Sequence, residues 1–186
     1  LETDLKAQNI DTLIFCMGRG LRTLPLAALH DGQQFLVENY SLTRIPAFKL
    51  TDTAYTDLKN SQVMAMGASE FKDLEPLPAV PVELSAIMQN LWQGKSFLNQ
   101  EFTLANLESQ REQPVKIIHL ATHADFRSGA PSNSFIQLWD TKLTVDKMRQ
   151  LRWNNPPVEL LVLSACKTAI GDKDAEMGFA GLALQA

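Results

Sequence analysis

Two reactive side chains, His123 and Cys166, each stand just after a short apolar run of the sequence. The first run covers residues 115–122 and the second covers residues 158–165. Short apolar runs bounded by turn-forming or small residues are typical of strands that are buried on both faces of a sheet. If these two strands are parallel neighbours, their carboxyl ends bring an imidazole and a thiol together at the edge where open α/β sheets bind ligands.

An imidazole beside a thiol can carry out nucleophilic catalysis. The thiolate is the reactive form, and an isolated cysteine with a pKa of about 8.5 is mostly protonated at neutral pH. A nearby histidine can take the thiol proton and later return it to a leaving amine. The spacing therefore makes His123 a candidate base and Cys166 a candidate nucleophile. The alternative is a buried structural cysteine and a histidine that hydrogen-bonds a neighbouring loop.

The other histidine and cysteine candidates are read as structural. His119 lies four positions before His123, which on a helix would be the spacing of a two-ligand metal site. The segment reads as a strand, along which two imidazoles lie too far apart to share one ion. We therefore expect His119 to be a core histidine, and we expect no metal and no cofactor. Cys16 ends the apolar segment 11–16 and is expected to be a reduced, buried thiol.

Composition restricts the class of protein. The chain has 186 residues, of which 45% are hydrophobic and 20% charged, values typical of a globular domain. The net charge of -4 and the scattered basic residues give no electrostatic reason to expect nucleic acid or a membrane as partner. No apolar run approaches the roughly 18–20 residues needed to span a bilayer, and no secretory signal opens the chain. We therefore expect a cytoplasmic location.

Strand-like and helix-like segments alternate along most of the chain. This order predicts an α/β fold with a mainly parallel sheet and helices on both faces, a three-layer α/β/α arrangement joined by right-handed crossovers. The segments expected to be strands, in addition to the two that precede the reactive residues, are 11–16, 35–45, 62–67, 96–98 and 135–139. The segments expected to be helices are 82–92, 103–108, 144–151 and 177–186.

Several motifs together resemble the CHAT domains, which are caspase-like domains often attached to tetratricopeptide repeats. The matching stretches are His-Leu-Ala-Thr-His-Ala (119–124), Leu-Ser-Ala-Cys-Lys-Thr (163–168), Gly-Phe-Ala-Gly-Leu (178–182) and residues 24–38. The resemblance runs from about residue 11, so residues 11–186 are expected to form the domain and residues 1–10 to be the end of an upstream element or a linker. CHAT domains normally continue with further strands after the helix that begins at Met177, so we expect the domain to be incomplete at its carboxyl end.

The resemblance implies a caspase–separase-type cysteine peptidase site, with His123 as base and Cys166 as nucleophile. In such sites the backbone N–H groups of the nucleophile and of the residue after the histidine hold the oxyanion. These positions are Cys166 and Ala124. Relatives commonly have glycine after the histidine, and Ala124 would be strained if the site required a positive φ.

The same resemblance bears on the substrate pocket. Relatives specific for arginine or lysine place an acidic residue two positions before the nucleophile, where this chain has Ser164. A neutral hydroxyl cannot neutralise a basic side chain, so that source of specificity is missing. Four acidic residues in loops near the predicted site could take this role: Asp125, Asp172, Asp174 and Glu176. The alternative for each of them is a solvated loop acid without a role in the site.

The expected function is a cysteine endopeptidase that cleaves a protein or peptide substrate. We expect a partner, or an upstream repeat region of the same parent protein, to gate its activity. The alternative is a catalytically silent caspase-like scaffold or protein-interaction module. A non-peptidase acyl-transfer or ligand-sensing domain is a third possibility.

Overall fold

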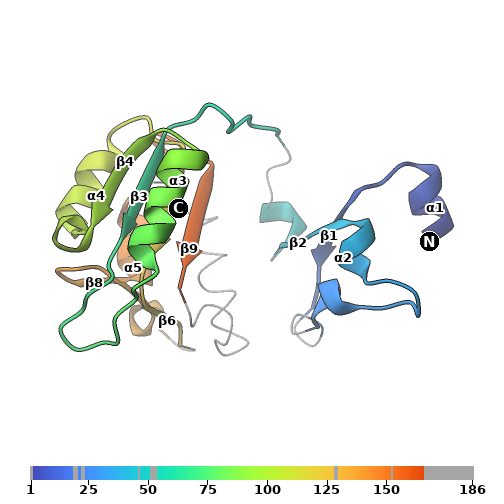
Figure 1. Cartoon of the computed structure of the whole chain (residues 1–186), viewed down its shortest axis with the longest axis horizontal. Helices are drawn as coiled ribbons and strands as arrows, with labels where there is room; N and C mark the ends of the chain where they lie inside the picture. The colour runs from blue at the N-terminus through green and yellow to red at the C-terminus, as the bar shows by residue number, and fades with distance from the viewer. Residues whose placement is uncertain are drawn as a thin grey trace. The chain divides into compact units, whose positions relative to one another are not determined.

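The structure of the chain is a computed structural model, and it describes residues 2–18, 21, 24–45, 47–50, 54–127, 130–151 and 153–165. The chain divides into two compact units, Leu1–Thr53 and Ala54–Ala186 (Figure 1). Cys166 and the helix expected over 177–186 lie outside the described residues. No helix in the described ranges is long and apolar enough to cross a membrane.

The first unit contains a pair of parallel strands. Strands β1 (Thr12–Cys16) and β2 (Ser41–Ile45) pair in register from one end to the other. Helix α1 (Glu2–Ala7) precedes β1, and helical turn α2 (Leu36–Asn39) precedes β2. The described part of the unit also contains the 3-10 turns η2 (Leu26–Ala28) and η3 (Phe48–Leu50).

Two predictions for this unit are wrong. Residues 35–45, expected as one strand, divide into α2 and β2, because Leu36 and Glu38 are good helix formers and Tyr40 N–H closes a turn on the Leu36 carbonyl at 3.1 Å. Strand β1 is not buried, since its residues alternate between exposed and half-buried. Cys16 is an exposed free thiol rather than a buried one. A two-stranded sheet has too few neighbouring elements to bury both faces of a strand.

The second unit is built on a four-stranded parallel sheet with the order β4-β3-β5-β9 (Figure 1). This arrangement confirms the mainly parallel α/β fold. The central strands, β3 and β5, are buried along their whole length, as their continuous apolar sequences predict. The four strands are β3 (Val63–Gly67), β4 (Gly94–Leu98), β5 (Ile117–Ala121) and β9 (Leu160–Ser164).

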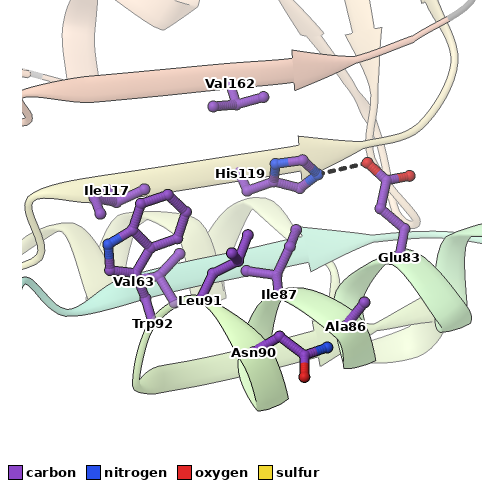
Figure 2. A pocket seen from close by; sticks show the side chains of 10 residues that line it. All are labelled: Val63, Glu83, Ala86, Ile87, Asn90, Leu91, Trp92, Ile117, His119 and Val162. Atoms are coloured by element: carbon purple, nitrogen blue, oxygen red, sulfur yellow. Dashed lines mark hydrogen bonds and ion pairs between the residues drawn. The ribbon is translucent and has the colours of Figure 1, made fainter. Parts of the chain in front are cut away.

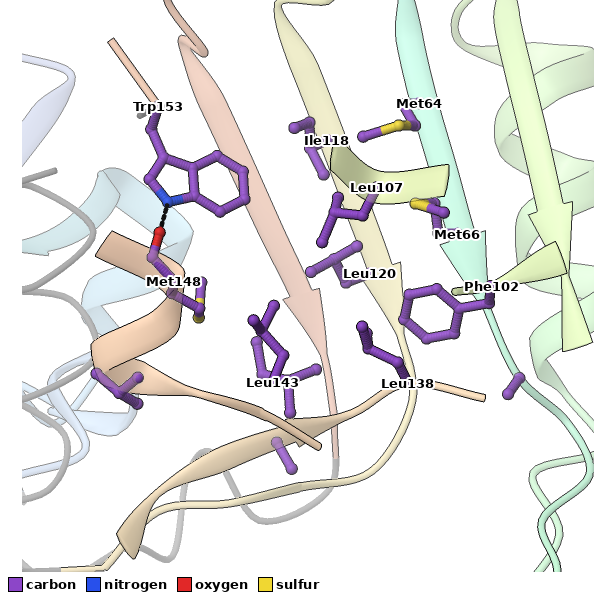
Figure 3. Packing of buried hydrophobic residues seen from close by; sticks show 14 of the residues in the cluster. Met64, Met66, Phe102, Leu107, Ile118, Leu120, Leu138, Leu143, Met148 and Trp153 are labelled. Carbon is purple, nitrogen blue, oxygen red and sulfur yellow. Dashed lines mark hydrogen bonds between the residues drawn. The ribbon is translucent and has the colours of Figure 1, made fainter. Parts of the chain in front are cut away.

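Helices α3 (Val80–Asn90) and α4 (Leu104–Arg111) cover opposite faces of this sheet. Helix α3 connects β3 to β4 and α4 connects β4 to β5, in opposite directions across the sheet, so right-handed connections place them on opposite faces. The side chains of β5 alternate accordingly. Ile117 and Ala121 belong to the clusters on the α3 face, whereas Ile118 and Leu120 pack in the cluster that contains Leu107 of α4 (Figure 3).

A compact excursion separates β5 from β9. It contains an antiparallel sheet of β6 (Ala124–Asp125), β7 (Phe135–Gln137) and β8 (Lys142–Thr144), and helix α5 (Val145–Met148). Within the residues described for the second unit there are also the 3-10 turns η4 (Asn99–Glu101), η5 (Pro131–Asn133) and η6 (Arg149–Leu151). Leu138, Leu143 and Trp153 bury this excursion against the α4 face of the sheet (Figure 3). The excursion begins directly after His123, so the packing of this core determines the path of the chain after β5.

Candidate active site at the carboxyl edge of the sheet

Strands β5 and β9 are parallel neighbours, which is the arrangement that a shared site of His123 and Cys166 needs. Their register pairs Ala121 with Ser164, the last residue of each strand. Thr122 N–H then donates to the Ser164 carbonyl at 3.0 Å, which extends the pairing past the end of β5. His123 follows immediately at this edge. Cys166 is two positions beyond Ser164 in the sequence and lies outside the described residues.

The imidazole of His123 is held by a backbone carbonyl. Its Nε2 atom lies 2.8 Å from the carbonyl oxygen of Glu75. A carbonyl oxygen can only accept a hydrogen bond, so Nε2 carries the proton and donates. In the neutral imidazole this leaves Nδ1 with a free lone pair, the form that a general base needs. The Glu75 carbonyl therefore selects the tautomer and orients the ring.

The segment that presents this carbonyl is anchored on both sides. Glu75 precedes Pro76, and a following proline restricts a residue to extended conformations. Farther along, Leu77 N–H donates to the Ser69 carbonyl at 2.8 Å. Ser69 itself is tied to the chain after β4, because its N–H donates to Asn99 Oδ1 at 2.7 Å. The loop after β3 is thus fastened to the sheet edge at the point where it contacts His123.

An aromatic ring forms the second contact of His123. The Phe71 ring lies with its centroid 4.7 Å from the imidazole centroid at an interplanar angle of 59°. Sequence reasoning missed both Phe71 and Glu75. A backbone carbonyl has no side-chain signature, and one phenylalanine in a polar loop is not distinguished from any other. The prolines at positions 76, 78 and 81 are a sequence signal that this connection has a restricted backbone conformation.

Ala124 is in extended conformation at the start of β6, opposite Ile136 of β7. The described non-glycine residues with positive φ are Asn9 and Asn99, so Ala124 adopts an ordinary backbone conformation without strain. The backbone N–H of Gln137 donates to the His123 carbonyl at 2.8 Å, so His123 and Gln137 form a hydrogen-bonded pair of the antiparallel ladder. Because such pairs alternate with non-hydrogen-bonded ones, the next pair, Ala124 with Ile136, is non-hydrogen-bonded. The N–H of Ala124 therefore points away from β7.

The two residues expected near the substrate pocket have different surroundings. Ser164 is half-buried at the end of β9, where its carbonyl is part of the pairing with Thr122. Asp125 binds Arg127, whose Nε and Nη2 atoms lie 2.9 Å and 2.6 Å from the same carboxylate oxygen. This contact raises the pKa of the Arg127 guanidinium. Because Arg127 already neutralises Asp125, a basic substrate side chain would have to compete for this carboxylate.

His119 lies in a separate environment on the α3 face of the sheet. Only 9% of its surface is exposed, as expected for a core histidine, and its Nε2 atom is 2.8 Å from Glu83 Oε1 of α3 (Figure 2). The pair lies at one side of a pocket of about 430 Å³ that Ile87, Trp92 and other apolar residues line. His119 and His123 thus have different partners. Among the described residues no group of three His, Cys, Asp or Glu side chains is arranged to hold a metal ion.

A mainly parallel four-stranded sheet with helices on both faces is consistent with a caspase-like α/β domain. The CHAT domain family model matches residues 1–186, the whole chain, and the chain therefore belongs to the CHAT domain family. The search of curated proteins found no match to the chain.

Proposed function

We propose that this chain is a cysteine peptidase domain in which Cys166 attacks the substrate carbonyl and His123 acts as the base. The observation that carries the proposal is the register of β5 and β9. Ala121 pairs with Ser164, and in the sequence His123 and Cys166 each follow two positions after these last paired residues. Neighbouring strands lie about 4.8 Å apart, a separation that histidine and cysteine side chains can bridge.

Acylation begins with a proton transfer. Nδ1 of His123 takes the thiol proton of Cys166, while Nε2–H remains bonded to the Glu75 carbonyl. The sulfur then attacks the peptide carbonyl carbon, and the electron pair of the C=O bond moves to oxygen. The Nε2–H bond to the Glu75 carbonyl is kept in the imidazolium that forms, because both nitrogens of an imidazolium are donors.

The oxyanion and the leaving group complete the cycle. The backbone N–H groups of Ala124 and Cys166 stabilise the oxyanion, and the orientation of β6 supports this role for Ala124. The C–N bond breaks as Nδ1–H of His123 protonates the amine, which leaves an acyl-enzyme. Water then attacks the acyl carbon while Nδ1 of His123 takes one of its protons. The C–S bond breaks, the carboxylic acid product is released, and His123 returns the proton to the thiolate of Cys166.

The substrate in this proposal is a protein or peptide, and a partner or an upstream repeat region of the parent protein gates access to the site. Ser164, half-buried at the end of β9, contributes to the substrate pocket without charge. The competing interpretation is a silent scaffold that retains the fold. The two interpretations differ in whether Cys166 and His123 are needed for cleavage.

A peptide-library cleavage assay tests the proposal. The chain is expected to cleave a subset of the library, and either Cys166→Ala or His123→Ala is expected to lower kcat/KM by about a thousandfold or more. Cys16→Ala and His30→Ala are matched controls, because both residues are exposed in the first unit, and they are expected to cleave as the unchanged chain does. Cleavage that survives Cys166→Ala contradicts the proposal, and an inert chain favours the scaffold.

A further inference from the structure

A pocket of about 630 Å³ adjoins the candidate site. Its walls are the loop 70–74 after β3 and the chain from β7 to β8. Two contacts connect it to His123. Phe71 lines the pocket and contacts the imidazole with its ring, and Gln137 lines the pocket and donates its N–H to the His123 carbonyl at 2.8 Å.

The inner wall of this pocket is aromatic. Phe71, Phe135 and Trp139 line it, and all three residues are half-buried. The charged residues that line it are exposed and therefore lie at its rim. They are two acids, Glu70 and Asp73, and two bases, Lys72 and Lys142.

The charged residues at the rim do not make the pocket favour a positively or a negatively charged ligand. Two acids and two bases cancel, and exposed charges are screened by solvent. The Nζ atom of Lys142 also lies 4.3 Å from the centroid of the Phe135 ring, which already engages this cation. An acidic side chain that entered would exchange its hydration for aromatic surface, at a cost in free energy, and a basic one would have to displace Lys142 from the Phe135 ring. An apolar side chain would gain free energy from the same exchange.

The walls are held in place before any ligand arrives. The backbone N–H of Trp139 donates to the Phe102 carbonyl at 2.9 Å, and Phe102 is completely buried. The Gln137 side-chain amide donates to the Leu138 carbonyl at 2.7 Å, so it does not project freely into the pocket. A preformed aromatic cavity can discriminate between side chains without the cost of ordering a loop.

We infer that this pocket is the subsite for an aromatic or large aliphatic side chain of the peptide substrate, at a residue adjoining the scissile bond. The inference rests on the proposed peptidase function and adds the class of side chain that the site selects. It assigns the specificity to Trp139, Phe135 and Phe71. Asp125, which Arg127 neutralises, is not needed for this selection.

A matched peptide series tests the assignment by cleavage. The peptides differ at one position adjoining the scissile bond, which holds Ala, Leu, Phe, Lys or Glu. The Phe and Leu peptides are expected to have kcat/KM values about ten- to a hundredfold above that of the Ala peptide, the range for a side chain filling an apolar pocket. Trp139→Ala is expected to reduce this ratio by about tenfold. A preference for Lys or Glu, or a ratio unchanged by Trp139→Ala, overturns the inference.

Two further variants control for folding. Tyr55→Ala removes an aromatic ring that is 90% exposed and lines none of the pockets described above, and it is expected to leave the ratio unchanged. Trp139→Leu keeps the wall apolar and replaces Trp139→Ala if the latter does not fold. It is expected to shift the preference from Phe towards Leu, and an unshifted preference counts against the assignment.

Binding separates this inference from the proposed function. Peptides of the same series are titrated into the Cys166→Ala chain by calorimetry, where no cleavage intervenes. The expected order of affinity is Phe and Leu above Ala, and Trp139→Ala in that background is expected to abolish the order. If the unchanged chain cleaves nothing but the order of affinity holds, the peptidase proposal fails and the subsite stands. Equal affinity for all five peptides overturns the subsite.

Discussion

Replacing Gly67 with alanine perturbs the sheet edge that positions His123. Gly67 is the last residue of β3 and pairs with Ala121 of β5, two residues before His123. A Cβ atom at Gly67 would lie 2.6 Å from the Ala121 carbonyl oxygen and 2.7 Å from Cγ1 of Val80 in α3. Both neighbours would have to shift, so the substitution pushes α3 and the end of β5 apart.

The loss of unfolding free energy expected for Gly67→Ala can be estimated from these distances. Ordinary contact begins near 3.4 Å, so the neighbours must move by about 0.8 Å in a closely packed interior. Overpacking of this kind costs about 1–3 kcal/mol of unfolding free energy. Alanine has less conformational freedom than glycine in the unfolded chain, and this offsets the loss of unfolding free energy by about 0.4–1 kcal/mol. The expected net loss is about 1–2 kcal/mol, with a lower kcat/KM per folded molecule because His123 is displaced.

Denaturant titration and cleavage kinetics measure the two effects on the same samples. Gly94→Ala is a matched control at the opposite end of β3, where an added Cβ would meet the Val63 carbonyl oxygen, and it is expected to lower stability without lowering kcat/KM per folded molecule. Gly18→Ala meets nothing within 4 Å and is expected to change neither quantity. A Gly67→Ala chain as stable as the unchanged one would refute the close packing at this edge.

Other substitutions test the core and the helix ends. Phe102→Ala removes a completely buried ring and is expected to cost about 3–5 kcal/mol in denaturant titration; a cost under about 1 kcal/mol contradicts its place in the core. Thr103→Ala removes the hydroxyl that accepts from Asn106 N–H at 3.2 Å and is expected to cost about 1 kcal/mol by the same measurement, with Thr103→Ser retaining most of the stability. Glu83→Ala removes the partner of His119 and is expected to lower the thermal midpoint while leaving the ranking of cleaved peptides unchanged; a changed ranking would connect that pocket with the substrate.

The parts of the fold that could be predicted from the sequence are those with continuous apolar runs or clear helical spacing, although β9, expected to be buried on both faces, is half-buried along its whole length. Strands β3, β5 and β9 follow continuous apolar runs, and α3 follows the spacing of Leu84, Ile87 and neighbouring apolar residues. Parallel strands between helices leave few alternatives for their order. The first unit was harder, because β1 and β2 are half-exposed and Leu36 to Asn39 has the composition of a helical turn.

The candidate site also has a part that could be predicted from the sequence and a part that could not. His123 could be placed at the sheet edge because its strand could be recognised. Its contacts with the Glu75 carbonyl and the Phe71 ring depend on how the loop after β3 returns, and no residue pattern encodes a backbone carbonyl. The ion pair of Asp125 with Arg127 is a contact between side chains two positions apart, and only coordinates show that it forms.

The exposed Cys16 provides an internal reference for the reactivity of Cys166. Alkylation of both thiols by iodoacetamide, followed peptide by peptide with mass spectrometry, compares their rates in one molecule. The dyad predicts that Cys166 reacts faster than Cys16 at neutral pH, and that His123→Ala removes this advantage while the rate at Cys16 stays the same. Equal rates at the two thiols, unchanged by His123→Ala, would contradict the pairing of His123 with Cys166.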